Sequence, residues 1–142
     1  MPPATVLSIL GRKKTPKKSI NLVDLDELSK KGVSKSSLLH LARYLGLSEG
    51  QIAELLPISL RTLQRYSGRK RFDRVVSEYI LQIAVVAARG VDVFDDKNKF
   101  LSWLRYPNRA LGNRTPTSLL GTRFGTEMVL NELGRIEYGV IS

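Results

Sequence analysis

Two short amphipathic segments on either side of Pro57 constrain the fold more than any other feature of the sequence. Ser48 opens a capping box, which predicts a helix over 49–56. Pro57 disfavours helical geometry at the residue before it, and Ser59 then supplies the N-cap of a second helix over 60–66. Two helices joined by so short a turn are typical of a helix-turn-helix unit.

The two predicted helices each have an apolar and a polar face. The inward positions of the helical pattern are Ile52, Leu55, Leu56, Leu60 and Leu63. The outward positions near the start of the second helix are Arg61, Thr62, Gln64 and Arg65. These residue types carry the donors, acceptors and methyl group that read base edges in a major groove, so we expect the outward four to bind DNA.

Basic side chains follow the second helix at once. They are Arg69, Lys70, Arg71 and Arg74. Mobile cations at this place can bind phosphates and displace counterions, so we expect Arg69, Lys70 and Arg71 to contact the DNA backbone. The alternative is a solvated basic face on an ordinary amphipathic helix.

The composition favours a nucleic-acid-binding protein of one or two small helical units. The formal net charge is +10 over 142 residues, and no lipid-anchoring motif is visible, so nucleic acid is a better partner than membrane. The absence of cysteine excludes disulfides and thiolate metal sites. No secretory signal opens the sequence, so a cytoplasmic protein is expected.

Residues 1–20 have no apolar periodicity and concentrate basic side chains without an acid. These basic residues are Arg12, Lys13, Lys14, Lys17 and Lys18. We predict a flexible arm, which either follows phosphates beside the helix-turn-helix or only increases solubility.

Two further helices are predicted before the helix-turn-helix. The sequence DLDE resembles a capping box that begins a helix at Asp24, and Gly32 ends it. Ser34 caps the next helix, which runs to Leu45. His40 is the only histidine and has no cysteine partner for zinc, so we expect a surface or half-buried structural role.

The longest periodic segment is 72–93. The apolar side chains at helical spacing are Val75, Val76, Tyr79, Ile80, Ile83 and Val86. Between Tyr79 and Ala88 the helix is apolar on nearly every side, so it must be buried on every side. The sequence favours a homodimer interface here, because a chain this short has few helices to surround it; the alternative is burial within one chain.

The final third contains two more predicted helices. Asp95 and Asp96 precede the first, over 97–105, and are expected to cap it rather than to hold a metal or transfer protons. Trp103 and Tyr106 are expected in the core rather than stacked on a base. In the turn-rich stretch that follows, Thr115 is an expected N-cap.

The last helix is predicted from Thr122, its N-cap, to Leu133. Its inward residues are expected to be Phe124, Met128, Val129 and Leu130. Gly134 should close this helix and leave RIEYGVIS as a tail.

Three features of the C-terminal half belong together: WLRYPNRALGNRTPTSLL at 103–120, the spacing of Gly125, Val129 and Leu133, and LGRIEYGV at 133–140. Through these features this half resembles the toxin-binding domain of Xre/MbcA/ParS-type antitoxins, which are partners of RES-domain toxins. The N-terminal half is similar to the Xre-like helix-turn-helix that precedes this domain, through DLDELSKKGVSKSSLLHLARYLGLS and RTLQR.

The resemblance implies an all-α fold, with a helix-turn-helix domain over 21–71 and a dimerisation and toxin-binding domain over 72–142. It implies an antitoxin of a type II system that forms a homodimer, binds its own promoter, and covers the active site of a RES-domain toxin acting on NAD. In the family the C-terminal end enters the toxin's cleft, which assigns toxin binding here to Arg135, Glu137 and Tyr138.

Two other functions compete with this interpretation. The first is a free-standing transcription regulator whose C-terminal half only dimerises. The second is an enzyme, but the sequence has no Gly-rich phosphate loop, cysteine nucleophile or histidine pair. We therefore expect a binding protein without catalytic residues, metal or cofactor.

Overall fold

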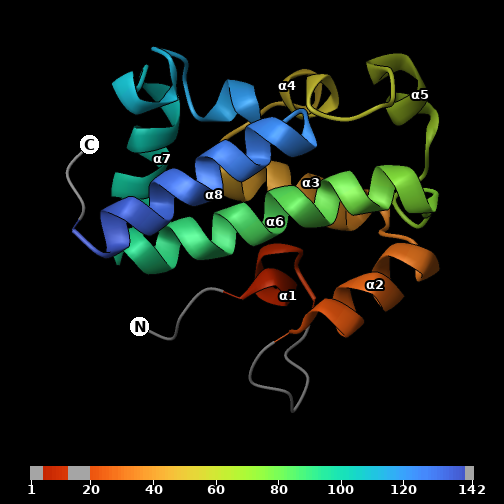
Figure 1. Ribbon diagram of the computed structural model, residues 1–142. Coiled ribbons are helices and arrows are strands. Elements are labelled where there is room, and N and C mark those ends of the chain that lie inside the picture. Colours follow the sequence, from red (N-terminus) through yellow and green to blue (C-terminus); the bar gives the residue numbers. More distant parts are fainter. Residues whose placement is uncertain (1–4, 13–19, 140–142) are drawn as a thin grey trace.

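The computed structural model describes residues 5–12 and 20–139, and within these ranges it is helical with no strand (Figure 1). The α-helices are α1 (Val6–Ile9), α2 (Leu22–Lys31), α3 (Lys35–Leu45), α4 (Glu49–Glu54), α5 (Leu60–Arg65), α6 (Arg74–Phe94), α7 (Lys97–Arg105) and α8 (Arg123–Glu137). Two 3-10 turns, η1 (Arg109–Leu111) and η2 (Thr117–Leu119), connect α7 to α8. The predicted all-α fold is confirmed.

The long helix α6 is the centre of the structure. In Figure 1, α8 lies along one side of it and α1 and α2 lie on the other, and α3 and α7 also contact it. Ile80 and Ile83 are 0% and 1% exposed. The chain therefore buries most of the apolar circumference by itself and leaves Tyr79, Val85 and Ala88 half-buried, so the homodimer stays a prediction. Val75, expected in the apolar stripe, is 46% exposed because Val76 takes the inward position.

The segment around α1 contradicts the flexible arm predicted over 1–20, for the part of it that the structure describes. Thr5 caps α1, and Val6, Ile9 and Leu10 are buried in the common core. Nδ1 of His40 lies 2.9 Å from the carbonyl oxygen of Ile9, which confirms a half-buried structural role for this histidine. One helical turn is too short to show a period in the sequence. Of the predicted arm cations, Arg12 is exposed, and the four lysines lie outside the described residues.

Helix caps account for most of the element boundaries. Ser34 caps α3, and Gly46 ends it in the left-handed conformation, as predicted. At α2 the predicted N-cap, Asp24, lies three residues after the observed one. Asn21 is the N-cap, and its side chain accepts from the backbone N of Asp24, whose carboxylate accepts in return from the N of Asn21. Asp24 is therefore the third residue of the helix rather than its cap.

Both aspartates between α6 and α7 were expected to cap the helix over 97–105, and only Asp96 does so. Asp96 caps α7 by accepting from the backbone N of Lys99 at 3.1 Å, and Asp95 ends α6 with a φ of 53°. The ring of Trp103 packs 5.6 Å from that of Phe94, which confirms a core position for this tryptophan. Tyr106 is 67% exposed, so the expectation that it is buried is wrong.

Helix α8 differs from its prediction in register and in length. Thr122 caps it as expected, but Phe124 and Met128 are 79% and 41% exposed. The buried side carries Gly125 instead, where an added Cβ would lie 2.0 Å from the carbonyl oxygen of Leu119. Only a glycine permits this close approach between α8 and Leu119. With Gly125 on the buried side of α8, the preceding residue, Phe124, faces solvent. Gly134 does not end α8, which continues for one more turn.

Candidate DNA-binding and partner-binding surfaces

The helix-turn-helix consists of α4, α5 and the turn between them. Ser48 and Ser59 cap the two helices, and Ser59 accepts from the backbone N of Thr62 at 3.0 Å. Ile52 and Leu63 are 0% exposed and bind the pair to the core. Leu60 was expected to face inward, but it lies in the first turn of α5 and is 37% exposed.

The segment that follows α5 is fastened to the start of α3. Lys35 is only 9% exposed, and its ammonium group donates to the carbonyl oxygen of Tyr66, the C-cap of α5, at 2.8 Å. The backbone N of Ser36 donates to Gly68, and that of Phe72 to Val33. A cation at a helix C-terminus is favourable, so Lys35 both ends α5 and fixes its direction. Sequence reasoning missed Lys35, since a lysine in a first helical turn carries no signal of a distant partner.

The predicted base-reading residues are not equivalent in the structure. Arg61, Gln64 and Arg65 are exposed on α5, and their side chains form no hydrogen bond or ion pair within the described residues. Thr62 is half-buried, and its hydroxyl accepts from that of Ser59 at 2.9 Å. The exposed base-reading face is therefore narrower than predicted.

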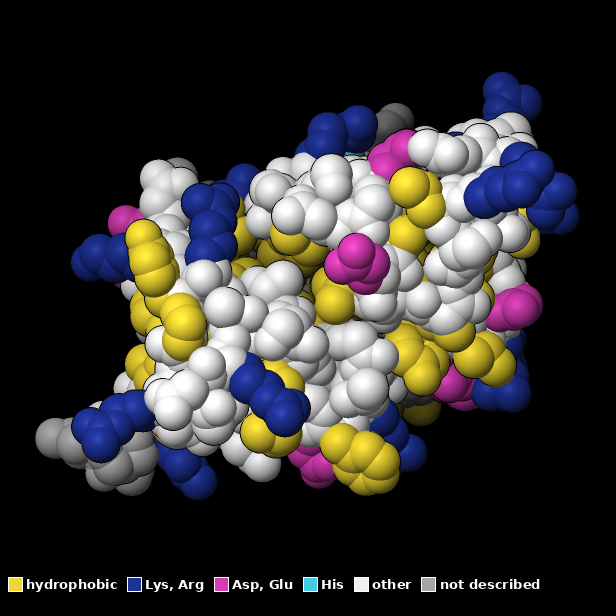
Figure 2. All heavy atoms as spheres, turned by 90° about the horizontal axis from the view of Figure 1, so that it is seen from above, with side chains coloured by type: hydrophobic (Ala, Val, Ile, Leu, Met, Phe, Trp, Pro, Cys, Tyr) yellow, Lys and Arg dark blue, Asp and Glu magenta, His cyan; other side chains and the backbone are white. Residues whose placement is uncertain are grey.

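The three residues predicted to contact phosphates also differ in their surroundings. Arg69 and Lys70 are exposed, and Lys70 lies 5.6 Å from the ring centre of Tyr66. Arg71 instead donates to the carbonyl oxygen of Gly32 at 2.8 Å, so it also has a structural role between α2 and α3. In the view from above, Lys and Arg side chains project from the end of the molecule where α5 lies (Figure 2).

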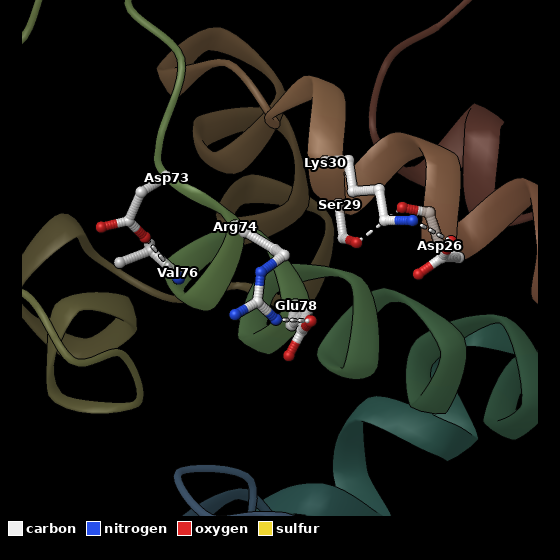
Figure 3. A network of polar contacts seen from close by, with 7 residues as sticks. All are labelled: Asp26, Ser29, Lys30, Asp73, Arg74, Val76 and Glu78. Atoms are coloured by element: carbon white, nitrogen blue, oxygen red, sulfur yellow. Dashed lines mark hydrogen bonds and ion pairs between the residues drawn. The ribbon is translucent and has the colours of Figure 1, made fainter.

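Basic residues at the start of α6 and in α2 are paired within their own helices. Figure 3 shows the Arg74 guanidinium directed at Glu78, with 2.8 Å between Nη1 and Oε1. Lys30 pairs with Asp26 at 3.0 Å. Both pairs are solvent-exposed and worth only a few tenths of a kcal/mol, so DNA phosphates could compete for these cations.

The three predicted toxin-binding residues lie at the end of α8. Arg135 and Tyr138 are exposed, the latter at 77%. The carboxylate of Glu137 accepts from the Arg89 guanidinium and so ties the end of α8 to α6. These residues therefore belong to a helical end rather than to the extended tail predicted after Gly134.

The exposed side of α8 is a second surface in this half, and sequence reasoning placed it in the core. Phe124 and Met128 occupy successive turns of this side, and Arg123 and Arg135 flank them. The spacing of Gly125, Val129 and Leu133 was the signal that fixes the register, because those three residues are buried.

Neither a metal centre nor a membrane span can be built from the described residues. They contain no cluster of three or more His, Cys, Asp or Glu side chains suited to a metal ion. None of the helices they form has the length and apolarity that crossing a membrane requires.

Comparison with known proteins assigns both halves. Residues 24–85 match the antitoxin Xre-like helix-turn-helix domain, and residues 89–139 match the antitoxin Xre/MbcA/ParS C-terminal toxin-binding domain. A chain in the crystal structure of the M. tuberculosis MbcT–MbcA toxin–antitoxin complex has a similar fold. Its TM-score is 0.58 at 20% identity, with 87% of this chain and 100% of that chain covered.

Two relatives are each named Antitoxin Xre. The one from Yersinia enterocolitica is 32% identical over 142 residues, which span 99% of this chain and 95% of the relative. The one from Photorhabdus laumondii is 38% identical over 96 residues, and this match covers 66% of this chain and 65% of the relative. The chain therefore belongs to the Xre antitoxin family, with an Xre-like helix-turn-helix followed by a toxin-binding domain.

Proposed function

We propose that this chain is the antitoxin of a type II toxin–antitoxin pair, that it neutralises a RES-domain toxin acting on NAD, and that it binds operator DNA to regulate its own operon. The observation that carries the proposal is the exposed end of α8, within a domain that matches a toxin-binding family. The proposed role is binding rather than catalysis, without a cofactor, in the cytoplasm where operator DNA and NAD are found.

The end of α8 has the chemistry to occupy a nucleotide cleft. Arg135 can form paired hydrogen bonds with a carboxylate or phosphate, and the Tyr138 ring can pack on an aromatic or apolar wall. Glu137 is paired with Arg89 in the free chain, so its contact with the toxin would require this ion pair to exchange. We therefore assign cleft binding first to Arg135 and Tyr138.

The test is growth rescue of cells that express the RES-domain protein of the neighbouring reading frame, with intracellular NAD measured alongside. The parent chain should restore growth and NAD. The variant Tyr138→Ala should restore them less while its circular dichroism is unchanged, since this side chain is 77% exposed. No rescue by the parent, and no copurification with the toxin, would contradict the antitoxin function itself.

Operator binding rests on Arg61, Gln64 and Arg65 for base edges and on Arg69 and Lys70 for phosphates. A homodimer would place two α5 helices on half-sites about one helical turn or a multiple apart. The exposed α5 face also suits a free-standing regulator. Copurification with the neighbouring toxin separates the two functions, because a free-standing regulator would bind the promoter and leave the toxin unbound.

A further inference from the structure

The outward side of α8 has the residue pattern of a helix that binds in a groove. Phe124 and Met128 are one turn apart, and Arg135 continues the same side two turns later. Peptide helices that bind in apolar grooves present anchors at this spacing. Phenylalanine, methionine and arginine are also enriched in protein–protein interfaces. Phe124 is 79% exposed, so most of its ring is not used in packing the fold.

The charges around this side identify the kind of surface that it fits. Seven cations are exposed between residues 97 and 139, all of which the structure describes: Lys97, Lys99, Arg105, Arg109, Arg114, Arg123 and Arg135. Three acids lie in the same range, but Glu132 is buried and Glu137 is paired with Arg89, which leaves Glu127. This half of the chain therefore carries a clear excess of exposed cations, and two of them, Arg123 and Arg135, lie on α8 together with the apolar anchors.

This charge excludes a second copy of the chain as the favoured occupant. In a two-fold contact the same patch meets itself, so Arg123 and Arg135 of one copy would face a patch that carries the same two arginines. Like charges brought together across an interface are unfavourable, whereas carboxylates at the edge of a groove would complement them.

We propose that the outward side of α8 docks in an apolar groove with acidic residues at its edge on the partner toxin, and that this contact, rather than the end of the helix, supplies most of the affinity. The inference rests on the proposed antitoxin function. It divides the domain into an anchoring surface, made by Phe124 and Met128, and an inhibiting end, made by Arg135 and Tyr138.

The experiment is calorimetric titration of a catalytically inactive form of the neighbouring RES-domain protein with the full chain. The double variant Phe124→Ala, Met128→Ala should raise Kd by about 30-fold or more, the level of interface hot spots. Arg123→Glu should raise it by about tenfold at low salt and lessen the salt dependence. Tyr138→Ala should change Kd little while relieving inhibition.

The matched control is Leu22→Ala, Val23→Ala, which truncates an apolar pair on α2 that is 83% and 64% exposed. It should leave Kd unchanged. Binding of the Phe124, Met128 double variant within threefold of the parent would overturn the inference, as would loss of a dimer in sedimentation with toxin affinity intact. If the parent chain itself fails to bind, the proposed function falls, and this inference falls with it.

Discussion

Two glycines of α8 should respond in opposite ways to the same substitution. At Gly125 an added Cβ would lie 2.0 Å from the carbonyl oxygen of Leu119 and 2.8 Å from its carbonyl carbon. Because the obstacle is backbone rather than a flexible side chain, Gly125→Ala must separate α8 from η2. Overpacking costs about 1–3 kcal/mol and occasionally more, so we expect a loss of about 3 kcal/mol in the free energy of unfolding.

Gly134 has no other atom within 4 Å of the position of an added Cβ, and it lies inside α8. Alanine is favoured over glycine in a helix interior by about 0.8–1 kcal/mol, so Gly134→Ala should stabilise the protein by about that amount. Urea unfolding followed by circular dichroism measures both variants against the parent. A destabilised Gly134→Ala would show that α8 ends at this residue in solution, and an unchanged Gly125→Ala would refute the described packing of η2.

Four further substitutions test other parts of the structure. Arg65→Ala should cost about 1–3 kcal/mol at the operator and relax its specificity, whereas Arg69→Ala should weaken binding to all DNA and reduce the salt slope by about one; equal operator affinity of Arg65→Ala and the parent would exclude base reading. Ile83→Asp should unfold the chain, because an unpaired buried charge costs several kcal/mol, and a folded monomer in ultracentrifugation would contradict this core position. Glu132→Leu should raise the free energy of unfolding by about 1 kcal/mol or more, since Oε2 of this 6% exposed residue has no hydrogen-bond partner within the described residues; a lower thermal midpoint would show that the carboxylate is paired in solution.

The sequence predicts the helices well because their start signals are local. Ser34, Ser48, Ser59 and Thr122 each accept from a backbone N–H three residues later, as their spacing indicates. A cap needs nothing from the rest of the chain, so it can be identified before the fold is known. The misplaced cap at α2 lies in a segment where Asn21 and Asp24 both have the chemistry of a capping residue, and Thr115, also expected as an N-cap, precedes the N-cap of η2, Pro116.

Contacts between distant residues could not be predicted in the same way. Hydrophobicity assigned Phe124 to the core, whereas the close approach at Gly125 decides which side of α8 is buried. Two of the binding residues whose roles changed, Arg71 and Glu137, have partners far away in the chain. Arg71 donates to the carbonyl of a residue 39 positions earlier, and Glu137 pairs with one 48 positions earlier. No local sequence pattern distinguishes a side chain with a distant partner in the same chain from one that is free to bind DNA or a toxin.

The shared helix α6 determines how the two proposed binding events relate. Both halves pack on it, and they also touch directly: an added Cβ at Gly121 would lie 3.5 Å from Cα of Leu55, at the end of α4, and Lys97 lies 4.1 Å from the ring centre of Tyr44 on α3. A change in direction between α5 and α8 would have to break these contacts or bend a helix whose core-facing residues, such as Ile80 and Ile83, are buried. One body therefore carries the proposed DNA-reading face and the proposed toxin-docking face at a fixed angle, so under these proposals the fold of this chain sets the position of the toxin relative to the operator.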